Sequence, residues 1–139
     1  MIRIETKGRA RALQLLYAWE LTGAPVVAEA ATGLARLTGP EPRILDRAEA
    51  LVTGVVASLD AIDRAAAVAA DNWRLSRIAT VERNILRLAI YELQRADPAA
   101  PPKVIIDEAV QLAHWFGGAR APAFVNGVLD RVARELGVL

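Results

Sequence analysis

The stretch SRIATVERNILRLAIYELQR, residues 76–95, decides the fold. Two adjoining apolar rows run along it at helical spacing, namely Ile78, Val81, Ile85 and Leu88 in one row and Leu86, Ala89 and Leu93 in the other. Only a narrow polar face remains, with Thr80, Arg83, Asn84, Arg87, Tyr91 and Gln94. A helix that is apolar over most of its circumference is expected to be central in the fold.

Helical periodicity continues on both sides of this segment. Further helices are expected from about Lys7 to Thr22, Val26 to Leu37, Ile44 to Leu59, Asp60 to Ala70, Lys103 to Phe116 and from Pro122 onward. Thr6 is expected to cap the first of them. No strand pattern or internal repeat interrupts the series, so the fold class predicted is all-α with about seven helices.

Bulk composition agrees with packed helices. Hydrophobic residues make up 54% of the 139 residues, many of them alanine, whereas aromatic residues make up only 5%. The length suits one domain, residues 1–139, with subdomains of roughly 1–70 and 71–139. Cysteine is absent, which excludes disulfides and agrees with a cytoplasmic protein. The charged N-terminus does not fit a signal peptide, and no apolar run predicts a membrane span.

Residues that could support catalysis or metal binding do not converge in the sequence. His114 is the only histidine, and a lone histidine in a chain without cysteine is a poor basis for a zinc site. Asp107 and Glu108 are adjacent, so they point to different sides of a helix and cannot form a carboxylate pair there. We therefore expect no cofactor, no metal and no enzymatic activity.

Basic side chains concentrate at the N-terminus. Residues 1–11 have a net charge of +3 within a chain of net charge +1. Lys7, Arg11 and Gln14 fall on one face of the first predicted helix, while Arg9 follows the apolar stripe and is expected to project past its end. These cations could bind phosphates, and Tyr17 could stack on a base. The alternative is a solvated basic tip with Tyr17 at the edge of the core.

The central helix carries a second set of candidates. Arg83 and Arg87 lie one turn apart, and we interpret them as an ordinary exposed arginine row. Glu82 flanks the apolar row, and a carboxylate there needs a partner. We expect Arg74 or Arg77 to be that partner.

Two phenylalanines bracket the loop before the last helix. Either Phe116 and Phe124 present their rings to solvent there or they close the core, and the core is the role expected for Phe116 in particular. Within the last helix, Gly127 is expected to permit the close approach of another helix.

Four segments resemble the NusB family. KGRARALQLLYAWE at the N-terminus is similar to its first helix, and VERNILRLAIYEL, residues 81–93, to its central helix. PPKVIIDEAVQLAHWFG, residues 101–117, and FVNGVLD, residues 124–130, resemble its last two helices in the same order. The likeness is weakest over residues 24–70. Gly8 interrupts what is commonly a denser arginine run, and the loop after Gly117 lacks the family's usual acidic and polar residues.

The resemblance implies two packed helical bundles and a transcription antitermination factor. Family members bind single-stranded boxA-type RNA together with the ribosomal protein NusE, as part of an RNA polymerase complex that reads through terminators in ribosomal RNA operons. The resemblance implies RNA-binding roles for Lys7, Arg9, Arg11, Tyr17, Glu82, Arg87, Phe116 and Phe124. Gln14 is added to this set because it shares the basic face of the first helix. Tyr17 and Phe124 would stack or pack on unpaired bases.

Two rival functions stay open at this point. In the first, the chain is a helical protein-interaction adaptor without RNA binding, and its basic tip only aids solubility. In the second, it is a module associated with a ribosomal RNA methyltransferase, although no cofactor-binding domain follows before Leu139. An apolar helix face could also serve a homodimer as well as the ribosomal partner.

Overall fold

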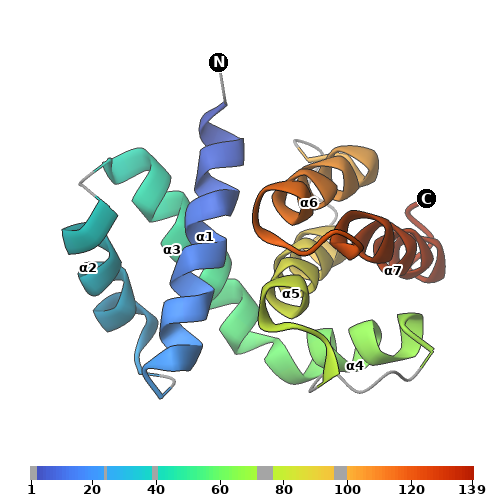
Figure 1. Cartoon of the computed structure of the whole chain (residues 1–139), viewed down its shortest axis with the longest axis horizontal. Helices are drawn as coiled ribbons and strands as arrows, with labels where there is room; N and C mark the ends of the chain where they lie inside the picture. Colours follow the sequence, from blue (N-terminus) through green and yellow to red (C-terminus); the bar gives the residue numbers. More distant parts are fainter. Residues whose placement is uncertain (1–2, 24, 39–40, 72–76, 96–99) are drawn as a thin grey trace. The chain divides into compact units, whose positions relative to one another are not determined.

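The computed structural model describes residues 3–23, 25–38, 41–71, 77–95 and 100–139. These ranges contain seven helices and no strand, which confirms the all-α prediction (Figure 1). The helices are α1 (Ile4–Leu21), α2 (Val27–Thr38), α3 (Pro42–Ala57), α4 (Leu59–Ala69), α5 (Thr80–Arg95), α6 (Pro102–Phe116) and α7 (Ala121–Glu135). None of these helices is long and apolar enough to cross a membrane.

The chain divides into two compact units. Unit 1 comprises Met1–Ala57 and unit 2 comprises Ser58–Leu139. The expected division lies near residue 70, but the structure places it before α4. The reason is that α4 packs against α5 and α7, so it belongs to the second unit.

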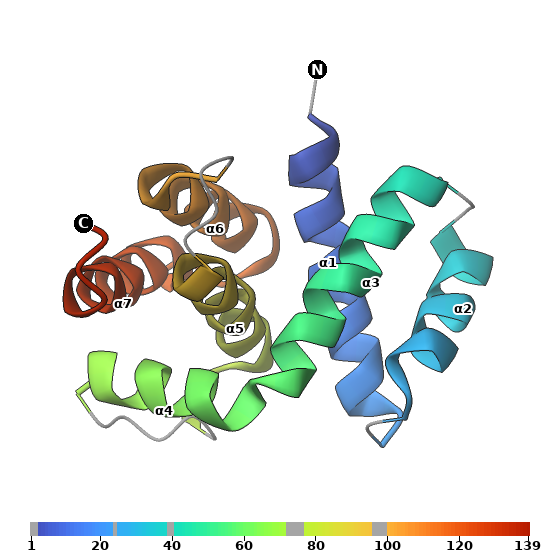
Figure 2. The same cartoon turned by 180° about the vertical axis from the view of Figure 1, so that it is seen from behind.

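Unit 1 consists of three helices that all contact one another. The main contact is between α1 and α3, and α2 packs against both (Figure 2). The buried side chains come mainly from α1 and α3, and include Ala12, Leu15, Leu16, Trp19, Ala48, Val52 and Val55. Leucine and valine make up most of these positions, and Ala12 and Ala48 are fully buried among them.

Helix α1 begins earlier than predicted and ends close to the predicted position. The helix begins at Ile4, so Thr6 is not its cap but a buried residue of its first turns. At the other end Gly23 adopts a left-handed φ of 85°, which suits glycine. The indole N–H of Trp19 then donates to the carbonyl of Pro25 at 2.6 Å, which ties the start of α2 to α1.

Helix α5 is the centre of unit 2. It contacts α4, α6 and α7, and every residue from Asn84 to Leu93 except Tyr91 is buried. This burial confirms that the segment quoted first is central. Helix α5 begins at Thr80, which is later than predicted. Ile78 precedes the helix and is nevertheless buried, while Ser76 lies outside the described residues.

Two glycines near α7 have opposite surroundings. A Cβ at Gly117 would lie 2.6 Å from the Cβ of Ala121 and 2.9 Å from the carbonyl oxygen of Ala113, so glycine is required there. A Cβ at Gly127 would meet no atom within 4 Å. The expectation that Gly127 permits close helix packing is therefore wrong: the residue is exposed.

We expect Gly127→Ala to stabilise the protein by about 0.5–1 kcal/mol, because alanine in a helix interior has less backbone entropy to lose than glycine. Gly117→Ala should instead destabilise it by about 1–3 kcal/mol through overpacking. Urea unfolding monitored by circular dichroism measures both changes. Equal effects of the two substitutions would contradict this reading of their surroundings.

Candidate nucleic-acid interface

One face of α1 presents basic and polar side chains to solvent. Lys7 and Gln14 are exposed and Arg11 is half-buried. The guanidinium Nη1 of Arg11 donates to Oε1 of Gln14 at 2.8 Å, which holds the arginine along the helix surface. One turn further on, Tyr17 keeps 46% of its surface exposed. Four of the candidate residues on α1 therefore share an accessible surface of unit 1, and we call these four residues the α1 face.

Arg9 does not belong to the α1 face. It is only 5% exposed, so the expectation that it projects past the end of the apolar stripe is wrong. The physical reason is the earlier start of α1. Because the helix begins at Ile4, Arg9 lies more than a turn inside it, on the same side as the buried residues Leu13 and Leu16.

Arg87 is likewise buried, at 8% exposure, and is not part of an exposed arginine row. Its guanidinium forms a two-pronged ion pair with Asp63 of α4, with Nε to Oδ1 at 2.8 Å and Nη2 to Oδ2 at 2.9 Å. Its remaining nitrogen Nη1 donates to Oδ1 of the fully buried Asn84 at 3.1 Å. Such fork-like pairing satisfies a buried arginine well. Arg87 therefore joins α4 to α5.

Glu82 has a backbone partner in the loop between α6 and α7. Its Oε1 accepts a hydrogen bond from the backbone N–H of Gly118 at 3.3 Å. Arg74, one of the two expected partners, lies outside the described residues. The carboxylate therefore reaches from the first turn of α5 to the short loop between α6 and α7.

That loop is flanked by aromatic side chains. Phe116 is 44% exposed at the end of α6, and Phe124 is half-buried in the first turns of α7. The expectation that Phe116 closes the core is therefore wrong. By helical spacing, Phe116 continues the buried row Ile105, Ala109 and Leu112. However, Phe116 is the last residue of α6, and at this end of the helix the row is no longer covered by the core.

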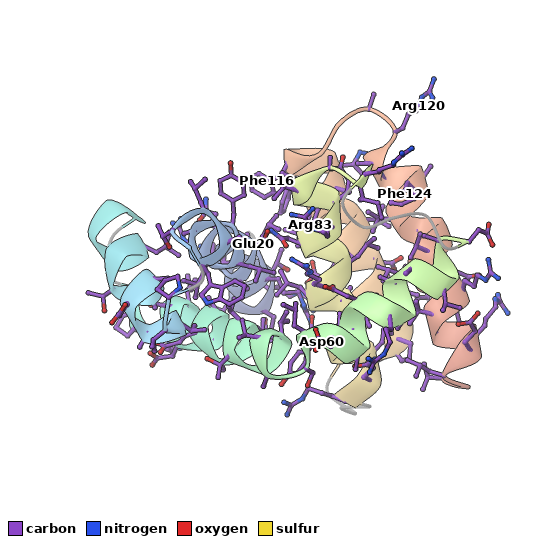
Figure 3. All side chains as sticks on the ribbon, turned by 90° about the horizontal axis from the view of Figure 1, so that it is seen from below. Glu20, Asp60, Arg83, Phe116, Arg120 and Phe124 are labelled. Carbon is purple, nitrogen blue, oxygen red and sulfur yellow. The ribbon has the colours of Figure 1, made fainter. Side chains whose placement is uncertain are left out.

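Two further side chains at this end of unit 2 were missed by the sequence analysis. Trp115 is 45% exposed and meets Phe116 edge to face, with ring centroids 6.4 Å apart. Arg120 is exposed at the tip of the loop and points away from the helices (Figure 3). The sequence signal for both was available, since an arginine and three aromatic residues lie within residues 115–124. Cations interleaved with aromatic rings are typical of single-strand binding surfaces.

Among the described residues, no group of three or more His, Asp or Glu side chains could hold a metal ion. In unit 1 an open hollow of about 380 Å³ lies between α1 and α2, and Glu29 is the one titratable side chain among its described lining residues. His114 is exposed on α6. The exposed side chains of the α1 face and of the loop between α6 and α7 offer charge pairing, hydrogen bonding and stacking.

A family model described as the NusB family matches residues 6–134. This chain belongs to the NusB family. The transcription antitermination protein NusB of Sorangium cellulosum is 46% identical over 94% of this chain and 91% of its own length. Its counterpart in Anaeromyxobacter dehalogenans strain 2CP-1 is 44% identical over 94% and 91%.

Solved NusB structures share the fold. The crystal form of T. maritima NusB is 30% identical, covers 96% of this chain and 92% of its own, and superposes with a TM-score of 0.80. A chain from the crystal structure of antitermination factors NusB and NusE in complex with double-stranded RNA is 25% identical, covers 97% and 99%, and superposes with a TM-score of 0.82. The predicted NusB-like fold is thus confirmed.

We expect the ion pair between Arg87 and Asp63 to stabilise the folded protein. Asp63→Ala should destabilise the protein by about 2–3 kcal/mol, because it removes the carboxylate that pairs with a buried guanidinium. The value is below that of a fully buried pair, since the Asp63 side chain is 24% exposed. Urea unfolding measures it, with Asp60→Ala, an exposed carboxylate of the same helix, as the matched control. A loss equal to that of the control would show that the pair contributes little.

Proposed function

We propose that this chain is a transcription antitermination factor that binds boxA-type single-stranded RNA together with the ribosomal protein NusE. Its membership of the NusB family supports the proposal, as do the names of its relatives and the solved complex of NusB and NusE with RNA. The single observation that carries the RNA-binding part is the α1 face, where the exposed Lys7 and the half-buried Arg11 share a helix surface with an exposed tyrosine.

In the proposed mechanism each unit contributes a surface to the RNA. Lys7 and Arg11 of the α1 face neutralise phosphates, Gln14 orients Arg11, and Tyr17 stacks on a base. In unit 2, Phe116 and Phe124 stack or pack on unpaired bases, and Arg120 adds a phosphate contact that the sequence analysis did not include. Arg9 and Arg87 are buried, so neither is assigned an RNA contact in this mechanism.

The protein acts as a scaffold in this proposal and catalyses no reaction. It works in the cytoplasm within the RNA polymerase antitermination complex and supports read-through in ribosomal RNA operons. A helical adaptor without RNA binding is the rival function. The basic α1 face disfavours that rival, since an adaptor has no need for a tyrosine exposed beside two cations.

The proposal is tested by titrating a fluorescently labelled boxA RNA and a base-shuffled control RNA, each with and without NusE. We expect tighter binding to boxA than to the shuffled RNA, and a further gain when NusE is present. Equal or absent binding to both RNAs in the presence of NusE would overturn the proposal and favour the adaptor.

Salt dependence tests the role of the α1 face separately. Lys7→Ala with Arg11→Ala should weaken RNA binding and should reduce the slope of log affinity against log salt by about 1.4, or roughly 0.7 for each lost contact to a single strand. The matched control is Arg43→Ala with Arg64→Ala, which removes the same charge from exposed positions on α3 and α4. An equal change of slope in the control would mean that only total charge matters.

A further inference from the structure

Trp115 is an exposed aromatic side chain to which the proposed mechanism gives no role. It lies in the last turn of α6, and 45% of its surface is exposed. The other tryptophan of the described residues, Trp19, is only 9% exposed, and its indole N–H donates to the carbonyl of Pro25. The indole of Trp115 has no hydrogen bond to another described residue. Its ring face and its N–H are therefore both available to a partner.

Phe116 orients this exposed indole. The two rings meet edge to face, with centroids 6.4 Å apart and planes inclined at 82°. Such a pair is favourable because the positive edge of one ring meets the negative face of the other. Both residues belong to α6, so a helical backbone fixes the positions from which the two rings project. A ring held in this way loses less conformational entropy on binding than a freely rotating ring.

The angle between the two rings decides how they can contact bases. A base held between two aromatic rings requires the rings to be roughly parallel, because stacking brings flat faces together. The rings of Trp115 and Phe116 are close to perpendicular, so they cannot hold one base between them. Rings whose faces point in different directions instead suit two different unpaired bases.

The surroundings of Trp115 favour a nucleic acid over a second protein. Gln111, one turn before Trp115, and the neighbouring His114 are both polar and exposed. Arg120 adds an exposed cation in the loop that follows α6. Aromatic rings among polar and cationic side chains are typical of single-strand binding surfaces. A protein docking site is instead expected to offer a contiguous apolar area.

We propose that Trp115 is a further RNA-binding residue, whose indole stacks on an unpaired base other than the base that meets Phe116. This inference rests on the proposed function, because it adds a contact to the same RNA surface of unit 2. Stacking is tolerant of base identity, since every base has a flat π face. Trp115 then contributes affinity rather than sequence preference.

Substitutions at the two rings are combined with altered RNAs to test this contact. Trp115→Leu removes the ring and keeps an apolar side chain, whereas Trp115→Phe keeps a smaller ring. Phe116→Leu removes the neighbouring ring. Leu136→Ala is the control, since it shortens another exposed apolar side chain of unit 2. Urea unfolding checks that each variant is folded.

Affinity is measured in the presence of NusE for intact boxA RNA and for a series of boxA RNAs. Each RNA of the series lacks the base of a single nucleotide and keeps its phosphates. A contact to one base then appears as a substitution whose effect disappears on one RNA of the series.

The stacking role predicts a specific pattern. Trp115→Leu weakens binding to intact boxA RNA by about 5- to 100-fold, the range typical of one stacked base. Trp115→Phe recovers part of this loss, and Leu136→Ala leaves binding unchanged. On the RNA that lacks the stacked base, Trp115→Leu causes no further loss. The effect of Phe116→Leu disappears on a different RNA of the series, because the two rings contact different bases.

Other patterns overturn the inference. If Trp115→Leu binds intact boxA RNA as tightly as the unchanged protein does, the indole does not contact RNA. If Trp115→Leu weakens binding to every RNA of the series equally, Trp115 acts through the fold or through NusE and not through a base. If the effects of Trp115→Leu and Phe116→Leu disappear on the same RNA, the rings share one base and the assignment is wrong. If the unchanged protein binds no RNA, the proposed function itself fails, and this inference fails with it.

Discussion

The burial of α5 is the constraint on which unit 2 depends. Because its residues from Asn84 to Leu93 are almost all inaccessible to water, a charged group among them needs a partner inside the protein. Arg87 pairs with the carboxylate of Asp63 and also donates to the amide oxygen of Asn84. The ion pair requires α4 to lie against α5. The same requirement explains why the boundary between the units precedes α4.

Much of the fold could be predicted from the sequence because helical periodicity is a local property. The apolar rows of residues 76–95 predicted a central helix, and the structure confirms it. The errors concern the ends of helices and the partners of charged residues. Arg9 is buried because α1 begins at Ile4, ahead of any capping signal that the sequence offers. The pairing of Arg87 with Asp63 joins residues from different helices, and no local pattern encodes that distance.

The candidate site was predictable in part for the same reason. Exposure of Lys7 and Gln14 follows from their spacing along one helix, which the sequence contains in full. Spacing does not decide the exposure of Tyr17, for which the sequence leaves both a stacking role and a place at the edge of the core open. Exposure of Phe116 does not follow from spacing, since its position continues a buried row and only the end of α6 removes it from the core. The role of Arg120 depends in turn on where a four-residue loop points, and loop geometry is not a periodic property.

The α1 face and the α6–α7 loop differ in what holds their side chains in position. On α1 the backbone is fixed by the helix, so a single side-chain hydrogen bond from Arg11 to Gln14 is enough to orient a cation. On the α6–α7 loop the backbone itself must be fixed first, because glycine restricts its own φ and ψ least of all residues. A carboxylate from a third helix is suited to that task. It accepts the N–H of Gly118, while the neighbouring Gly117 has no room for a Cβ. The α6–α7 loop is therefore held from two sides, by a carboxylate of α5 and by the close packing of Gly117 against Ala113 and Ala121.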